Sequence, residues 1–261
     1  MKWSAIAYRP MTMHEDALYD AIFKRRSVRR YAGPLEPGTM EEVERFAHSL
    51  KPLFPDIRAE VRFIGGDDLR GPFKVEAPHF LAIFSEAKEG FAANAGFMLQ
   101  QMDLFLSSRG IGSCWQGGPR PTRDVKKVSD RNFVISLAFG MPAEEVHRQS
   151  VSEFKRRPLG EMTDIQGMER LLEPARLAPS GMNRQSWYFT GNEDVIRVHH
   201  ARSVITDRMN QVNAGIALCH LWLATLHDGG RAELALEKDA GQDAPRGFSY
   251  VASVFSSERG S

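Results

Sequence analysis

The feature that most constrains the fold of this chain is an order of elements that occurs twice. Hydrophobic periodicity predicts a helix, two strands, a long apolar helix and a strand in the first half, and the same order again in the second. The long helices share Asn, Ala, Gly and Leu in one register, beginning at Asn94 and Asn213, and Gly110 and Gly229 follow at the same offset. We interpret the restart as an internal duplication. The alternative is that two apolar helices of similar length look alike.

The expected elements define the fold class. Helices are expected at residues 16–26, 39–50, 91–108, 168–177 and 213–227, and strands at 60–64, 80–84, 133–139, 187–190, 195–199 and 248–255. Thr39 is the expected N-cap of the second helix, with Glu42 three residues later. Residues 1–15 are expected to form an arm and residues 141–160 a polar connection. The pattern predicts an α+β fold of two domains, residues 1–150 and residues 151–261.

Composition excludes several classes of protein. The 261 residues are 42% hydrophobic and 26% charged, which is ordinary globular composition, and the net charge of +1 gives no field that would recruit nucleic acid or an anionic membrane. Two cysteines, Cys114 and Cys219, argue against a disulfide-stapled secreted fold. No stretch has the length of a membrane span, and the N-terminus lacks the apolar region of a signal peptide. A cytoplasmic location is expected.

The sequence KRRSVRR at residues 24–30 is the first candidate site. Arg25 and Arg29 would be neighbours on a helix, where like charges repel unless an anion lies between them. Arginine presents a fork of donors that suits phosphate oxygens, and Ser27 adds a hydroxyl. The alternative is a solvated basic face, or cations that favour the negative end of the helix.

The sequence APSGMNRQSW at residues 178–187 is the second candidate. Its proline, serine, glycine and asparagine predict a shaped loop. Ser180, Asn183 and Gln185 offer a hydroxyl and two amides to the heteroatom edge of a planar ligand, although an ordinary helix-to-strand turn has a similar composition.

Two further segments are weaker signals. GIGSCWQGG at residues 110–118 has four glycines, which would let backbone N–H groups approach a ligand closely. Cys114 lacks a pattern of His and Asp partners and is expected to be a buried cysteine. KRRPLG at residues 155–160 is basic and, taken alone, has the composition of a linker.

In this order, the segments resemble the FMN-dependent nitroreductase family. The family's Arg-Arg-Ser-x-Arg helix end matches Arg25, Arg26, Ser27 and Arg29, and its Ala-Pro-Ser-x-x-Asn-x-Gln-Pro-Trp loop matches residues 178–187, with Ser186 in place of the proline. Its Gly-Leu-Gly-Ser/Thr segment matches residues 110–115, and its strand ending in Gly-x-Pro matches residues 137–142. Its Arg-Arg-Pro-Leu segment matches residues 156–159.

The chain departs from the family in where the motifs stand. The Asn/Gln loop follows the first helix closely in the family, whereas here it occurs only near residue 180, and each motif is present once. Two subunits of the family share residues across two flavin sites. The resemblance therefore implies a single-chain pseudo-dimer of two related halves, each with a helix-flanked antiparallel sheet, that completes one flavin site.

The resemblance also implies roles for the site residues. The FMN phosphate would be neutralised by Arg25, Ser27, Arg29, Lys155 and Arg157, and Arg26 would lie near the pyrimidine end of the flavin. Pro179, Ser180, Gly181, Asn183 and Gln185 would lie against the flavin from the other half, and the backbone of Trp115, Gln116, Gly117 and Gly118 would approach the ring. No protein nucleophile, general base or metal is expected.

The implied function is oxidoreduction, in which NADH or NADPH reduces FMN and a nitroaromatic or quinone-like small molecule accepts the electrons. A flavin-binding protein without turnover is the alternative, and a nucleic-acid-binding module is disfavoured by the near-zero net charge. The pseudo-dimer design implies a monomer or a weak dimer.

Overall fold

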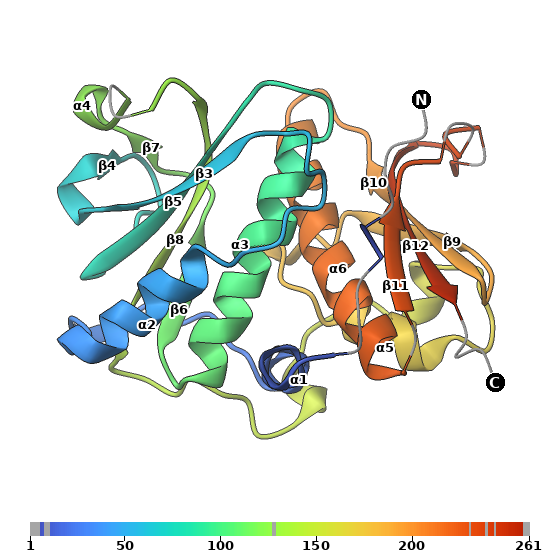
Figure 1. The fold of residues 1–261 in the computed structure, drawn as a ribbon, viewed down its shortest axis with the longest axis horizontal. Coiled ribbons are helices and arrows are strands. Elements are labelled where there is room, and N and C mark those ends of the chain that lie inside the picture. Colours follow the sequence, from blue (N-terminus) through green and yellow to red (C-terminus); the bar gives the residue numbers. More distant parts are fainter. Residues whose placement is uncertain are drawn as a thin grey trace. The chain divides into compact units, whose positions relative to one another are not determined.

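The computed structural model describes residues 6–7, 11–126, 129–229, 231–237, 240–242 and 244–257. The chain forms two compact units (Figure 1): a central unit, Lys24–Glu153, and a terminal unit made of Met1–Phe23 and Phe154–Ser261. The expected division into residues 1–150 and 151–261 differs from this one, because the segment before residue 24 groups with the second half of the chain and not with the first.

The central unit is built on an antiparallel five-stranded sheet. Its strands run in the order β2-β8-β5-β3, and β6 also pairs with β8. The strands are β2 (Tyr31–Gly33), β3 (Ala59–Ile64), β5 (His79–Ser85), β6 (Gly112–Gln116) and β8 (Asn132–Pro142), with a separate pair, β4 (Leu69–Arg70) and β7 (Arg120–Pro121). The helices are α2 (Pro37–Ala47), α3 (Phe91–Ser108) and α4 (Arg123–Lys126).

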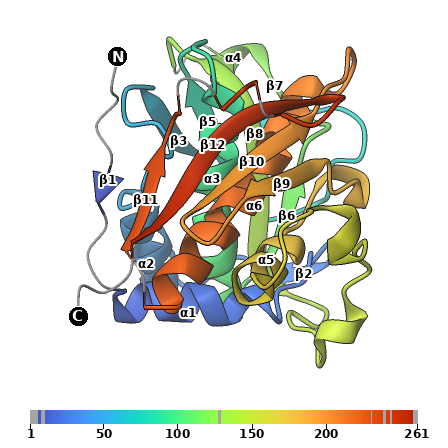
Figure 2. The same cartoon turned by 90° about the vertical axis from the view of Figure 1, so that its right-hand side faces the viewer.

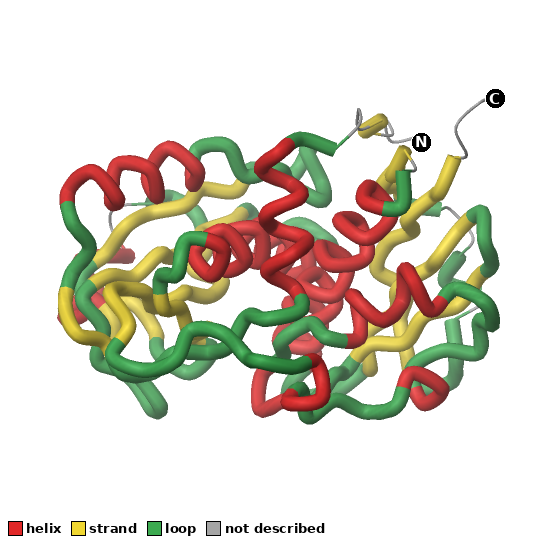
Figure 3. Tube along the Cα trace, turned by 90° about the horizontal axis from the view of Figure 1, so that it is seen from below, coloured by secondary structure: helices red, strands yellow, loops and turns green. Residues whose placement is uncertain are grey.

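The terminal unit has its own antiparallel sheet, which faces the viewer in Figure 2, with strand order β1-β11-β12-β10-β9. The strands are β1 (Ile6–Ala7), β9 (Trp187–Gly191), β10 (Val195–Ala201), β11 (Arg231–Ala235) and β12 (Phe248–Ser257). The helices are α1 (Met13–Ile22), α5 (Glu169–Arg176) and α6 (Asp207–His227). In Figure 3 the strands (yellow) of each unit lie beside its helices (red).

Each unit is organised around one long buried helix. α3 is buried from Ala92 to Ser107, and the ring of Phe105 stacks on Phe46 of α2 at 4.0 Å between centroids. α6 is buried from Val212 to Leu226 and packs on α5, α1 and the sheet of its own unit. Since burying one large apolar side chain contributes about 1.5–3 kcal/mol, these two helices supply much of the stability of their units. No helix in the described residues is long and apolar enough to cross a membrane.

The two equivalent asparagines, Asn94 and Asn213, make the same kind of hydrogen bond in their units. The Asn94 side-chain oxygen accepts hydrogen bonds from the backbone of Leu53 (2.7 Å) and Phe54 (3.0 Å), in the loop that follows α2. The Asn213 oxygen accepts from the backbone N–H of Gly181 at 3.1 Å, in the loop that follows α5. Each long helix thus holds the loop after the preceding short helix, which gives the sequence repeat a common structural cause.

The glycine after each long helix is also equivalent. Gly110 and Gly229 have φ of 72° and 85°, the left-handed conformation that ends helices and that glycine adopts without a steric penalty. A strand then follows in each unit, β6 after Gly110 and β11 after Gly229. β11 was not expected from the sequence, and neither was the pairing of residues 112–116 as a strand.

Three helices start earlier than expected, and α6 shows the largest difference, since it begins at Asp207 and not at residue 213. α1 begins at Met13 because Thr12 and Glu15 form a capping box, and it ends at Ile22, four residues before the expected end. α2 begins at Pro37 after Glu36, so Thr39 lies inside the helix and is not its N-cap. A proline suits the first turn, where its missing N–H would have no partner in any case.

Candidate functional site

The basic segment at residues 24–30 is extended and not helical. Arg25 forms a β-bridge with His147, and Ser27 forms one with Ser113 at the start of β6. The expected repulsion of Arg25 and Arg29 on one helix face therefore does not arise. The segment is instead held in the sheet of the central unit, with the Val28 N–H donating to the Ser113 carbonyl at 2.8 Å.

Arg25 is the most buried cation of this segment, with 1% of its surface exposed. Its Nε lies 2.9 Å from Oδ2 of Asp103, a fully buried residue of α3, and its terminal nitrogen donates to Ser27 Oγ at 3.1 Å. Asp103 also accepts hydrogen bonds from Ser113 Oγ (2.7 Å) and Gln100 Nε2 (3.2 Å). The charge of Arg25 is thus offset inside the protein, which the sequence did not indicate.

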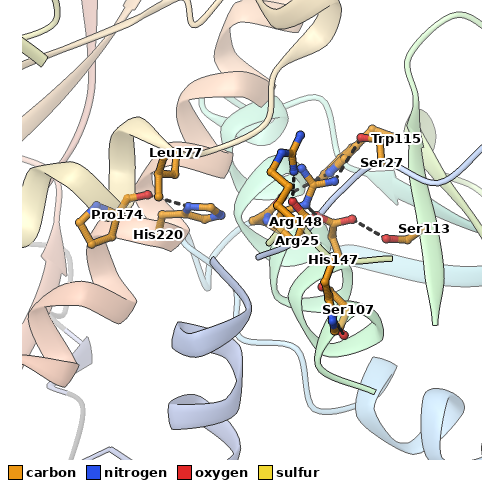
Figure 4. Close-up of polar contacts among 12 residues, drawn as sticks. Arg25, Ser27, Ser107, Ser113, Trp115, His147, Arg148, Pro174, Leu177 and His220 are labelled. Carbon is orange, nitrogen blue, oxygen red and sulfur yellow. Dashed lines mark hydrogen bonds and ion pairs between the residues drawn. The ribbon is translucent and has the colours of Figure 1, made fainter. Parts of the chain in front are cut away.

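Arg148 is a second cation at this place, and sequence reasoning missed it. Its backbone N–H donates to the Lys24 carbonyl at 2.8 Å, and its guanidinium donates to the Arg25 carbonyl (Figure 4). Burial, and then the charges of Arg25 and Arg26, lower the pKa of Arg148 to about 10. We call Arg25, Arg26 and Arg148 the arginine cluster. No motif marked residue 148, which lies in the expected polar connection.

The remaining arginines of the segment are more exposed. Glu144 accepts hydrogen bonds from the backbone N–H of Arg29 (2.6 Å) and Arg30 (3.2 Å), and these contacts lower the pKa of its carboxyl. The Arg30 guanidinium pairs with the same carboxylate at 3.4 Å. Arg30 therefore has its own counterion and lies apart from the arginine cluster in electrostatic terms.

The glycine-rich segment serves the packing of the central unit. A Cβ on Gly118 would lie 2.5 Å from the Pro72 carbonyl oxygen, and one on Gly112 would lie 2.7 Å from Val28. The Gly117 carbonyl accepts from the Arg120 guanidinium at 2.8 Å. These close contacts explain the glycines by packing, with no ligand needed. That the backbone of this segment approaches a bound flavin ring stays a prediction.

The polar side chains of the same strand also bond within the unit. The Trp115 indole donates to Gln100 at 3.3 Å, and the Gln116 side-chain oxygen accepts from the Val75 N–H at 3.0 Å. Cys114 is buried, and burial raises the pKa of its thiol, which disfavours the reactive thiolate.

The loop at residues 180–185 contacts the basic segment at residues 155–157, both in the terminal unit. Asn183 accepts from the Arg156 guanidinium at 2.6 Å and donates to the Lys155 carbonyl at 2.6 Å. Gln185, 3% exposed, accepts from the Arg157 N–H at 2.7 Å and donates to the Asn183 carbonyl at 2.8 Å. The two amides expected to meet a ligand are thus directed to the protein's own backbone and to Arg156, which the sequence analysis did not single out.

The same loop has an unusual backbone. Met182, Asn183 and Gln185 have φ of 52°, 56° and 48°, a left-handed conformation that costs an ordinary residue about 1–2 kcal/mol. Met182 is also 90% exposed. Strain of this kind clusters at ligand sites, so the geometry is consistent with a binding loop. Pro179 is buried, Ser180 is partly buried and accepts from the Gln185 N–H at 2.9 Å, and Gly181 is exposed.

Asn183→Ala should lower the free energy of unfolding by about 1–2 kcal/mol, because alanine loses the contacts to Lys155 and Arg156 and fits the left-handed backbone less well than asparagine. Urea unfolding measures the loss. Asn183→Gly is the matched control, since it removes the same contacts without the backbone penalty. Equal stability of Asn183→Ala and the unaltered chain would show that these contacts contribute nothing.

The predicted site residues therefore form two sets, each within one unit. Arg25, Arg26, Ser27 and Arg29 lie in the central unit with Arg148 and β6, while Lys155 and Arg157 lie in the terminal unit with the 180–185 loop. Arg157 pairs with Glu161 at 3.1 Å, and Lys155 is exposed. Across the described part of the chain, no group of three or more His, Cys, Asp or Glu side chains could hold a metal ion.

Comparison with known proteins places the chain among nitroreductases. A family model described as "Putative TM nitroreductase" matches residues 17–225. The structure is similar to that of a "putative nitroreductase" from Thermotoga maritima MSB8, with 20% identity, a TM-score of 0.61, and coverage of 97% of this chain and 98% of the other. This likeness confirms the expected α+β, nitroreductase-like fold.

Two shorter proteins match about half of the chain. A nitroreductase family protein from Clostridium difficile 630 is 19% identical, with a TM-score of 0.44 and coverage of 58% of this chain and 96% of the other. An FMN-dependent nitroreductase from Clostridium difficile R20291 is 18% identical, with a TM-score of 0.41 and coverage of 54% and 96%. No curated protein matches the chain.

Proposed function

Because the chain belongs to the nitroreductase family whose model matches residues 17–225, we propose that it is an FMN-dependent oxidoreductase. NADH or NADPH is the proposed electron donor, and a nitroaromatic or quinone-like small molecule is the proposed acceptor. Fold alone does not give function, so the proposal depends on the chemistry of the two sets of site residues.

The observation that carries the proposal is the arginine cluster beside Ser27. The guanidinium groups of the cluster and the Ser27 hydroxyl give the central unit the positive charge and the donors that suit a phosphate-bearing ligand. The family comparison supports FMN as the source of that phosphate, since one of the similar proteins is named as an FMN-dependent nitroreductase. Arg29, on the same segment, is exposed and available to the same anion.

The terminal unit carries the second set of proposed site residues. Asn183 and Gln185 hold the 155–157 segment, so Lys155 and Arg157 add positive charge, while Pro179, Ser180 and Gly181 present the loop to the flavin. In the central unit the backbone at Trp115, Gln116, Gly117 and Gly118 lies at the edge of the sheet and is the proposed neighbour of the ring. FMN, when bound, supplies the hydride- and electron-transfer chemistry.

The chain's own contribution is then binding and electrostatics. Positive charge and N–H donors near the pyrimidine edge of a flavin stabilise its anionic reduced form, and Arg26 is the proposed residue there. Each set of residues occurs once in the chain, so one flavin site per chain is proposed. On this model no second subunit is needed to complete it.

We expect the purified chain to hold FMN and to saturate near one flavin per chain. Heat releases a non-covalent flavin, which mass spectrometry identifies, and titration of the flavin-free chain gives the stoichiometry. FAD in place of FMN, or no binding with excess FMN, would refute the cofactor; two flavins per chain would refute the single site. Bound FMN that neither NADH nor NADPH reduces would favour a flavin-binding protein without turnover.

A further inference from the structure

Two arginines near Ser27 have carboxylate partners, which reduces the positive charge that they offer to a phosphate. Arg25 is paired with Asp103 at 2.9 Å and is almost fully buried, so this pair contributes little net charge. Arg30 is likewise paired with Glu144. The positive charge around Ser27 must then come chiefly from Arg26, Arg29 and Arg148.

Arg148 is placed to supply it. Its backbone N–H donates to the Lys24 carbonyl, and its guanidinium donates to the Arg25 carbonyl. The ring of the preceding residue, His147, is hydrogen-bonded to the Ser107 carbonyl at 2.8 Å, at the end of α3. The side chain is partly buried and therefore loses part of its hydration. A cation ordered before the anion arrives pays little entropy on binding.

The surroundings of Arg148 favour an anion. The neighbouring charges of Arg25 and Arg26 disfavour its charged form, and Glu153 is the carboxylate that opposes them. A phosphate dianion between like charges removes their mutual repulsion and gains charge-assisted hydrogen bonds. Arg26 is partly buried at the same place.

We propose that Arg148 binds the phosphate of the cofactor together with Ser27, and that Arg25 is a positioning residue, which Asp103 holds so that it orients Ser27. The inference rests on the proposed function for the source of the phosphate. It adds a ligand that lies outside the Arg-Arg-Ser segment and reassigns Arg25 from neutralising charge to orienting a hydroxyl.

Binding of FMN and of riboflavin tests this, because riboflavin lacks only the phosphate. Arg148→Gln in the full chain should raise the Kd for FMN by about 10- to 150-fold and leave the Kd for riboflavin unchanged, as measured by flavin fluorescence. Arg30→Gln is the matched control, since Arg30 is an exposed arginine with its own counterion, and it should change neither. If Arg148→Gln does not fold, Arg148→Lys should show the same selective loss, reduced in size, because lysine keeps the charge but not the fork.

Inorganic phosphate gives a test that does not depend on the flavin. At equal ionic strength, phosphate should raise the Tm of the flavin-free chain more than chloride does, and Arg148→Gln should lose that excess. Phosphate also stabilises proteins by exclusion from their surface. The evidence for a site is therefore the difference between the rise in Tm of the unaltered chain and the rise in Tm of Arg148→Gln.

The outcomes separate the two proposals. An unaltered chain that binds no flavin, yet shows a phosphate effect that Arg148→Gln loses, refutes the proposed function and keeps the Arg148 site. An unaltered chain that binds FMN, with Arg148→Gln binding it equally well, refutes the inference alone. Equal losses for FMN and riboflavin would show that Arg148 is only structural and would also overturn it.

Discussion

Asp103→Asn should lower the free energy of unfolding by about 3–5 kcal/mol, because it leaves the charge of Arg25 buried without a partner. Asparagine keeps the shape of the side chain, so the loss reports charge and not a cavity. Urea or thermal unfolding of the flavin-free chain measures it.

A double variant separates the contribution of the Arg25–Asp103 ion pair to stability from that of the hydrogen bonds around it. Arg25→Met with Asp103→Leu removes both charges and should recover part of the stability, since a buried ion pair can be replaced by apolar residues at little cost. Recovery is partial because Ser113 and Gln100 still lose their acceptor. Flavin affinity should remain low in the double variant, because Ser27 is no longer oriented by Arg25.

An exposed pair provides the control. Glu42 lies 3.1 Å from Arg109, and both side chains are about half exposed, so Glu42→Ala should cost less than about 1 kcal/mol. If Asp103→Asn cost no more than Glu42→Ala, the buried pair would not stabilise the central unit. Equal losses in the single and double variants would place the effect in the hydrogen bonds and not in the charges.

The parts of the fold that the sequence predicted are those with local causes. α3 has the expected bounds, because its apolar residues extend around the whole helix and Gly110 stops it. The match of Asn94 and Asn213 indicated the repeat, and the structure gives the reason in the loop that each side chain holds. The capping box of Thr12 and Glu15 was an available signal that the interpretation of residues 1–15 as an arm overlooked.

The parts that failed depend on contacts far apart in the sequence. A run of basic residues normally lies at the surface, and nothing within residues 24–30 shows that Arg25 is buried. The missed signal is Asp103, the only charged residue in the apolar helix Phe91–Ser108, since a buried carboxylate needs a cation and the basic run offers one. Arg148 has no such signal, and contacts far apart in the sequence, the bridge of His147 with Arg25 and the bond from the Arg148 N–H to the Lys24 carbonyl, bring it to the site.

The grouping of α1 with the second half also has a non-local cause. Tyr19 of α1 stacks on His227 at the end of α6, with ring centroids 3.8 Å apart, and α1 packs along α6. The helix pattern at residues 13–22 reports which face is apolar but not which helix covers it. A division of the chain at one point in the sequence therefore cannot group α1 with α6, whereas the compact units divide the chain after Phe23 and after Glu153.

Gln185→Ala should weaken FMN binding by about 5- to 150-fold, although no atom of its side chain needs to touch the flavin. The buried amide joins the Arg157 N–H to the Asn183 carbonyl, and its loss leaves a donor unsatisfied at a cost of about 1–3 kcal/mol. The 180–185 loop and the 155–157 segment would then have to be ordered again when FMN binds. Alanine and glutamine bear similar strain at φ of 48°, so the change isolates the hydrogen bonds.

Isothermal titration with FMN measures the effect, and unfolding of the flavin-free chain should show a loss of the same size. Gln166→Ala is the matched control, because Gln166 is exposed in the same unit and its side chain, within the described part of the chain, makes a long 3.5 Å contact to the Asp164 carbonyl. Lower stability with unchanged FMN affinity would show that the terminal unit does not take part in the site. The site would then belong to the central unit alone, and Arg148 with Ser27 would account for the whole of the phosphate contact.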